Sequence, residues 1–167
     1  ILKESSNRGT LMHGYLSEML SGKMNGELIE EVNLPKKMAE TIITHGLNDY
    51  VKEVYASEEC VYSLKYKYAG TMDALISTQN NKLQICDFKQ KNSPAKREYS
   101  SIRNYFTQCI LYSIAHNETY GTNIQSCIIL MCTPNLIFQK FEIEGQEFMD
   151  LQKEALERVK RYHELVN

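Results

Sequence analysis

The chain has 167 residues, a length that favours one domain of roughly 100–200 residues and allows a core without disulfides or structural metals. Hydrophobic residues make up 43% and charged residues 24%, as in an ordinary soluble protein. No apolar run approaches the roughly 20 residues that a membrane helix needs, so we expect no membrane partner. The net charge of −2 gives little support to a protein that coats nucleic acid through bulk charge.

The cysteine pattern favours free thiols in a reducing, intracellular compartment. The number of cysteines is odd, no C-x-x-C pair occurs, and most of them lie inside apolar runs. These spacings do not fit a zinc or iron–sulfur site. The cysteines are Cys60, Cys86, Cys109, Cys127 and Cys132. A targeting segment cannot be read, and we expect residues 1–167 to form a single domain or a fragment of a longer chain.

The first predicted element is a helix near the start of the chain. Ser6 or Asn7 is a candidate N-cap, and apolar residues repeat at helical spacing up to about Leu20. Gly22 and Gly26 then predict a loop.

A second helix and three strands are expected next. Pro35 suits the first turn of a helix, which an irregular apolar stripe extends to about Val54. Short β-like runs follow at 60–64, 66–76 and 82–88. The polar residues 78–81 predict a hairpin turn between the last two strands.

The second half of the chain continues with helix, strand and helix. A helix is expected at 100–116, a buried strand at 124–133, an edge strand at 139–143 and a closing helix at 147–166. This order predicts an α/β fold in which a small central mixed sheet is flanked by helices.

The strongest local feature joins two acidic residues and a lysine. Residues i and i+2 of a strand share a face, so Asp87 and Lys89 project together, while Cys86 and Phe88 point toward a core. We therefore expect Asp87 and Lys89 to line a cleft or solvent. Antiparallel pairing across the hairpin brings Asp73 beside Asp87.

Two carboxylates and an ammonium suit the hydrolysis of phosphodiesters. Mg²⁺ takes oxygen ligands, which Asp73, Asp87 and the backbone carbonyl of Phe88 can supply. Lys89 would position the attacking water or offset developing negative charge. The alternative is a surface hairpin that carries an ordinary ion pair.

Four short motifs follow one another with a consistent order and spacing. They are Gly9–His13, Gly70–Asp73, Asp87–Lys89 and Gln108–Tyr112. The pattern resembles the RecB-type branch of the PD-(D/E)XK nuclease superfamily and is similar to the mitochondrial genome maintenance exonucleases. The resemblance covers about two thirds of the chain, and each motif alone is weak.

The resemblance implies a restriction-endonuclease-like core, DNA as substrate, and Mg²⁺ as cofactor, with Mn²⁺ as a substitute. It implies that Asp73 and Asp87 are metal ligands, that Lys89 is the catalytic lysine, and that His13 is a ligand or an organiser. The chain departs from the family at Gln90, where Thr or Ser is common. Some relatives hold a four-cysteine iron–sulfur cluster, but the cysteine spacing here leads us to expect none.

Glycine at position 9, four residues before His13 on the same helical face, would let a DNA backbone or another strand approach closely. A lone helical histidine is otherwise more often structural. Glu58 and Glu59 precede a predicted strand, and we favour solvated acids at the strand end over metal ligands. The alternative is that one of them adds a carboxylate to the metal site, and for that role Glu59 is preferred. Neighbouring residues of a strand point opposite ways, so at most one of them can do so.

A second group of residues is expected to contact DNA or support the lysine. Gln108 and Tyr112 lie four residues apart on a predicted helix, and Tyr105 shares their face; the alternative is a polar flank beside the core. The run that follows Lys89 is locally basic and can track phosphates or form a solvated loop. Its candidates for DNA binding are Lys91, Arg97 and Arg103.

We therefore predict a Mg²⁺-dependent exonuclease that acts on single-stranded DNA ends. The alternatives are an endonuclease of the same superfamily, a catalytically inactive DNA-binding or assembly module, and an interaction domain in which the motif is a coincidence. Tyr99 and Tyr105, interleaved with the basic run, are candidates for base stacking, although both can equally belong to the core.

Overall fold

The computed structural model describes residues 2–22 and 33–166, which form a five-stranded sheet between two pairs of helices. The elements in chain order are α1 (Leu2–Leu20), α2 (Leu34–Ile42), a π-helical turn η1 (Ile43–Leu47), β1 (Val51–Ser63), β2 (Tyr68–Thr78), β3 (Leu83–Gln90), α3 (Ser100–Tyr120), β4 (Cys127–Cys132), β5 (Phe138–Ile143) and α4 (Gly145–Val166).

The strands lie in the order β1-β2-β3-β4-β5, and the sheet is mixed. Strands β3 and β4 are parallel, whereas the other three neighbouring pairs are antiparallel. Parallel neighbours need a long crossover, and α3 supplies it. The six residues of β4 are all buried, as expected for a strand that is covered on both faces.

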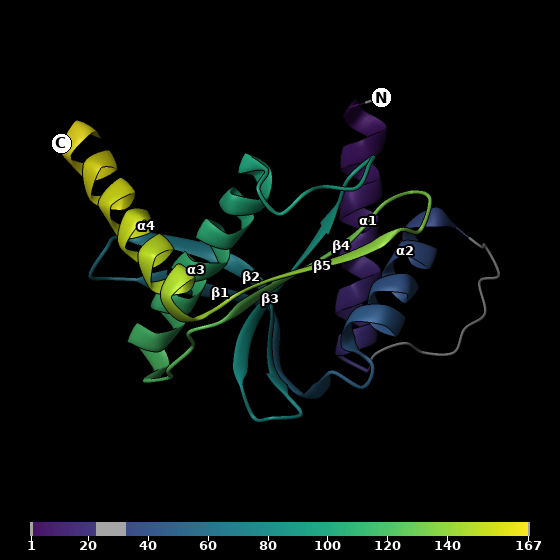
Figure 1. Ribbon diagram of the computed structural model, residues 1–167, viewed down its shortest axis with the longest axis horizontal. Coiled ribbons are helices and arrows are strands. Elements are labelled where there is room, and N and C mark those ends of the chain that lie inside the picture. The colour runs from purple at the N-terminus through teal and green to yellow at the C-terminus, as the bar shows by residue number, and fades with distance from the viewer. Residues whose placement is uncertain (1, 23–32, 167) are drawn as a thin grey trace.

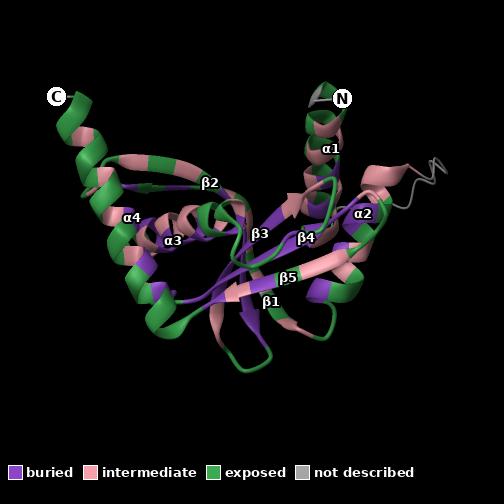
Figure 2. Ribbon diagram, turned by 45° about the horizontal axis from the view of Figure 1, so that its top comes forward, coloured by how far each residue is buried: buried purple, intermediate pink, exposed green. Residues whose placement is uncertain are grey.

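Each face of the sheet is covered by one pair of helices (Figure 1). Helices α1 and α2 lie on one side, and α3 and α4 lie on the other. Met12 and Leu16 of α1 and Met38 of α2 belong to the first core layer, while Phe106 of α3 and Phe148 of α4 belong to the second. Figure 2 shows the buried strands between these layers and the exposed outer part of α4.

This architecture confirms the predicted α/β class and most of the predicted elements. The turn at 78–81, the edge strand and the helices near 100 and 147 lie where they were expected. Helix α1 begins by Leu2, so Ser6 and Asn7 lie inside the helix and the prediction that either caps it is wrong. Gly26, expected in a loop, lies outside the described residues.

The predicted extension of the second helix to Val54 is also wrong. The helical segment ends at Leu47, and β1 begins at Val51. Val51 and Val54 both pack on the α1–α2 core layer although they are three residues apart. Irregularities in the β1–β2 register between Val51 and Ala56 interrupt the regular alternation of β1 side chains between the two faces of the sheet. The resulting spacing of three resembles that of a helix.

Within the described part of the chain, no helix is both long enough and apolar enough to cross a membrane.

Candidate active site

Strands β1 and β2 are irregular at the level of two acidic residues. Met72 and Leu75 pack in the same core layer although they are three residues apart on β2, so the alternation of faces reverses between them. Asp73 lies in this interval. Opposite it on β1, Glu58 has a φ of 51°, which is uncommon for a residue other than glycine. The irregularity turns both acidic side chains toward one place.

The side chain of Asp73 replaces part of the regular pairing between β2 and β3. The pairing of these strands ends at Ala74 and Cys86. Beyond this pair, the backbone N–H of Phe88, two residues after Cys86, donates a hydrogen bond of 2.7 Å to Oδ2 of Asp73, the residue before Ala74. The carboxylate is therefore fixed between the diverging strands.

His13 reaches the same carboxylate from α1. Its Nδ1 lies 3.5 Å from Oδ1 of Asp73, and its ring meets the ring of Phe88 edge-on. Burial lowers the pKa of His13, but the hydrogen bond and the charge of Asp73 outweigh this effect, and the pKa is raised. Burial likewise acts to raise the pKa of Asp73, whereas His13 and the Phe88 N–H lower it more strongly.

Three side chains with metal-binding atoms converge at this point. The ligand atoms of His13, Glu58 and Asp73 all lie within 4.8 Å of one another. The preference for Glu59 was wrong, because Glu59 accepts a hydrogen bond from the Tyr120 hydroxyl and Glu58 faces the site. The positive φ of Glu58 accounts for the difference, since it departs from the extended backbone on which the expectation rested.

Asp87 is buried, with only 3% of its surface exposed, so the expectation that it lines a cleft or solvent was wrong. It lies on the face of β3 that α3 covers, which explains the burial. Burial and the nearby charge of Asp73 raise the pKa of Asp87 to about 7, although Lys89 acts in the opposite direction.

Lys89 is held between Asp87 and α3. Its Nζ lies 2.9 Å from Oδ2 of Asp87 and donates a hydrogen bond of 3.1 Å to Oε1 of Gln108. The amide of Gln108 in turn donates to the Tyr112 hydroxyl at 2.7 Å, and the Tyr105 ring centroid lies 4.8 Å from Nζ. Burial lowers the pKa of Lys89, but the charge of Asp87 raises it more, so the ammonium form is favoured.

Two motif glycines make room for residues of other motifs. A Cβ on Gly70 would lie 2.6 Å from Cε1 of Tyr112, so the ring packs directly on the β2 backbone. A Cβ on Gly9 would lie 3.3 Å from Cγ of Gln90 at the end of β3. The group that approaches Gly9 closely is therefore the Gln90 side chain of β3.

Gln90 also connects β3 to α1 through hydrogen bonds. Its Oε1 accepts from Nε and an η-nitrogen of Arg8, and its amide donates to the carbonyl and hydroxyl of Ser5. Our reading of the sequence missed this role of Arg8, because no local pattern indicates a partner 82 residues away.

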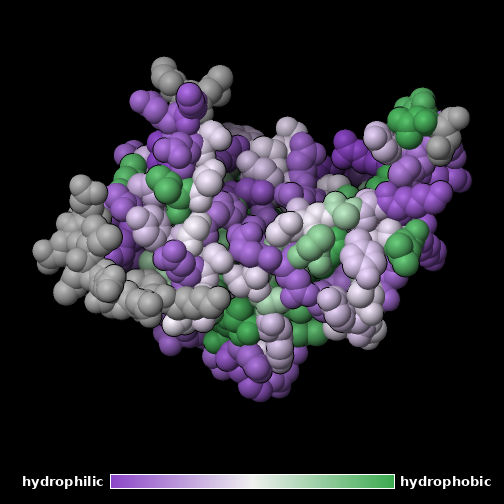
Figure 3. All heavy atoms as spheres, turned by 180° about the vertical axis from the view of Figure 1, so that it is seen from behind, coloured by the Kyte–Doolittle hydropathy of each residue, from purple (hydrophilic) through white to green (hydrophobic). Residues whose placement is uncertain are grey.

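A cleft of about 820 Å³ opens beside the three converging side chains. One wall is formed by residues of α1, which are small or hydroxylated apart from His13 and Glu18, and the other wall by residues of β1, β2 and β3. The lining residues are Ser6, Gly9, Thr10, His13, Gly14, Ser17, Glu18, Glu58, Thr71, Asp73, Lys89 and Gln90. Figure 3 shows the largely hydrophilic surface of the molecule seen from behind. A groove of about 730 Å³ between residues 65–67 and α4 is mostly apolar with a lysine-rich rim, and its described residues include no group of three converging metal ligands.

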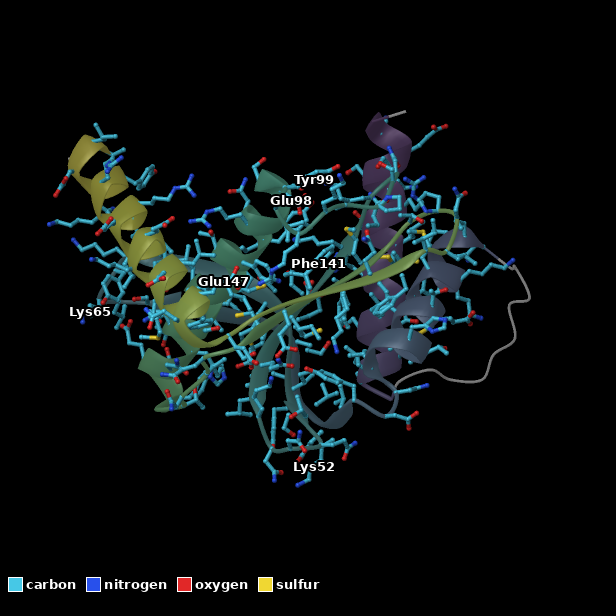
Figure 4. The ribbon with its side chains drawn as sticks, in the orientation of Figure 1. Lys52, Lys65, Glu98, Tyr99, Phe141 and Glu147 are labelled. Carbon is cyan, nitrogen blue, oxygen red and sulfur yellow. The ribbon has the colours of Figure 1, made fainter. Side chains whose placement is uncertain are left out.

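The predicted DNA-binding cations have protein partners. Lys91 donates to the Ser101 hydroxyl at 2.8 Å. Arg97 and Arg103 form ion pairs with acidic residues of α4, Glu147 and Glu154, at 2.6 and 2.5 Å. Tyr99 is 44% exposed at the start of α3. It lies beside Glu98, on the side of the molecule toward which the N-terminal part of α1 projects (Figure 4).

No protein-family model matches the chain, and no curated protein matches it in sequence. Among solved structures, it is similar to a candidate exonuclease from Eubacterium rectale, with a TM-score of 0.59, 16% identity, and coverage of 92% of this chain and 64% of the other. A structure named SSO0001 matches with a TM-score of 0.45 and 17% identity, over 92% of this chain and 58% of the other. The chain thus spans less than two thirds of either protein. At these identities, the first match shows a shared fold.

Proposed function

We propose that this domain is a metal-dependent nuclease that hydrolyses phosphodiester bonds of DNA. The observation that carries the proposal is the convergence of His13, Glu58 and Asp73 within 4.8 Å, in a cleft that Lys89 also lines. The shared fold with the candidate exonuclease supports it by analogy.

The donor set fits a hard divalent cation such as Mg²⁺ or Mn²⁺. Asp73, Glu58 and the backbone carbonyl of Phe88 offer oxygens, and His13 offers a nitrogen. Among the described residues, Oδ2 of buried Asp87 finds no hydrogen-bond partner of good geometry, although Lys89 lies 2.9 Å away. This oxygen is ion-paired with Lys89, so the proposal of Asp87 as a further ligand rests on its place beside Asp73. The ion would lower the pKa of an attacking water and stabilise charge on the phosphoryl group.

The other groups of the site have roles that follow from their contacts. Lys89 remains an ammonium, so it orients the water or offsets negative charge and does not accept a proton. Gln108 and Tyr112 hold that ammonium in place through two successive hydrogen bonds. The Asp73 carboxylate raises the pKa of His13, so a metal that binds to this side chain competes with a proton.

We further propose that the substrate is a single strand that is degraded from an end. The slightly negative net charge does not favour broad duplex binding, and Tyr99 and Tyr105 are candidates for base stacking. The test compares a linear single strand, the same strand circularised, and a blunt duplex, each with Mg²⁺, with Mn²⁺ and with EDTA.

Cleavage of the linear strand alone, abolished by EDTA, is the expected result. Rapid cutting of the circle would show an endonuclease and contradict the requirement for an end. A preference for the blunt duplex would contradict the single-strand claim. Binding without cleavage under every condition would show an inactive DNA-binding module.

A further inference from the structure

The fold accounts for all but one of the seven glycines that the structure describes. Three have a positive φ, and three would bring a Cβ within 3.3 Å of another side chain. The first three are Gly22, Gly121 and Gly145, and the second three are Gly9, Gly46 and Gly70. Gly14 has neither property, because its φ is not positive and a Cβ there would meet no atom of residues 2–22 or 33–166 within 4 Å.

Gly14 is therefore unfavourable for the folded chain and has no packing function in return. It is exposed in the middle of α1, where glycine destabilises a helix relative to alanine through its backbone entropy. The space beside it is open to the cleft, next to His13 and one helical turn from Thr10 and Ser17. As far as the described part of the chain goes, that space is open to a ligand.

We infer that the sugar–phosphate backbone of the bound strand crosses α1 in contact with Gly14. This inference rests on the proposed function and assigns a substrate contact within the same cleft. The opposite wall carries Glu58, Asp73 and Lys89, so a phosphate at the site lies within reach of the α1 surface. Glycine lets a backbone approach the helix closely, whereas any side chain would hold it away.

The chemistry of the α1 wall suits a sugar–phosphate backbone better than bases. Ser6 and Ser17 place hydroxyl groups along the cleft, and hydroxyls are common donors to phosphate oxygens. The Thr10 hydroxyl donates to the Ser6 carbonyl, and Glu18 adds one carboxylate to this wall. Apart from His13, the residues of α1 that line the cleft include no ring on which a base can stack.

The test measures binding separately from cleavage. In a Lys89→Ala background, which prevents turnover, Gly14→Ala and Gly14→Leu are compared by fluorescence anisotropy with a labelled oligothymidylate in Mg²⁺. Asn7→Ala is the matched control, because it also improves helix propensity at an exposed α1 position but lies outside the lining of the cleft.

Gly14→Ala should raise Tm by roughly 2 °C and weaken binding several-fold, and Gly14→Leu should weaken it by roughly tenfold or more. Asn7→Ala should leave the affinity unchanged. Unchanged affinity of Gly14→Leu, or no binding by the Lys89→Ala background, would overturn the inference. Failure of the wild type to cleave DNA in either metal would overturn the proposed function, while the binding comparison would still decide the position of the strand.

Discussion

The two sides of the candidate site differ in how firmly their side chains are held. On the α3 side, Asp87 is buried, and Lys89 is linked through Gln108 to Tyr112. On the α1 side, the cleft is open, Glu58 is exposed, and His13 is half-buried.

This difference indicates that the two sides of the site have different roles in the reaction. The α3 side fixes one cation in a low-dielectric setting, where charges act strongly. The α1 side leaves space and uncommitted ligand atoms for an ion and a substrate. Substitutions that release Lys89 on the α3 side should therefore affect the chemical step, and those on the α1 side should affect metal and substrate binding.

The largest effects are expected at the three residues where both sides meet. Asp73→Ala and Asp87→Ala should abolish cleavage and weaken Mn²⁺ binding in calorimetry, because each removes a hard ligand. Lys89→Ala should lower turnover at least about a hundredfold while Mn²⁺ still binds. Wild-type rates in Asp87→Ala and Lys89→Ala would contradict the proposed site.

A pair of variants compares the two sides directly. His13→Ala should lower turnover in Mg²⁺ by roughly ten- to a hundredfold, with partial recovery in Mn²⁺, which binds nitrogen and oxygen ligands more tightly. Gln108→Ala should lower turnover about tenfold without such recovery, because it releases Lys89 and leaves the ligands intact. Steady-state kinetics measure both responses. If Mn²⁺ restores the two variants equally, the proposed difference between a metal-binding α1 side and a lysine-positioning α3 side is wrong.

The buried carboxyl of Asp87 predicts how the metal-free domain responds to pH. Its pKa in the folded state, about 7, lies above the unfolded value near 3.9. Folding therefore favours the protonated form, and the associated stability is fully present below about pH 4 and lost as pH rises through about 7.

Asp87→Asn should remove this dependence. In EDTA at pH 8, the variant should be more stable than the wild type by on the order of 2 kcal/mol, as measured by urea unfolding. Addition of Mg²⁺ should raise the Tm of the wild type more than that of the variant. A variant that is less stable in EDTA at pH 8 would contradict the raised pKa.

The sequence predicted the elements and the facing of β3 because these depend on local periodicity. Cys86 and Phe88 do face one core layer, and Asp87 and Lys89 face the other way. The sequence did not predict the burial of Asp87, which depends on how α3 crosses the sheet. The choice of Glu58 over Glu59 depends on a reversal of strand alternation, which no local pattern shows.

The smallest effects are expected at the outer edge of the α3 side. Arg97 and Arg103 pair with acids of α4, and Arg97 also donates to the Glu142 carbonyl. Exposed ion pairs of this kind contribute about 0–1 kcal/mol and hold the guanidinium groups near α4. Arg97→Gln and Arg103→Gln should each change single-strand affinity by less than about twofold.

Lys91→Gln is the comparison on the same basic run, two residues beyond Lys89 and bonded only to a neutral hydroxyl of Ser101 among its described side-chain contacts. It should weaken binding more than either arginine change and lower the slope of log affinity against log salt by about one, as expected for the loss of one phosphate contact. Anisotropy titrations at several salt concentrations measure both quantities. A larger loss of slope in Arg97→Gln or Arg103→Gln would show that these arginines exchange α4 for the phosphates when DNA binds, and would extend the DNA-binding surface to the outside of α3.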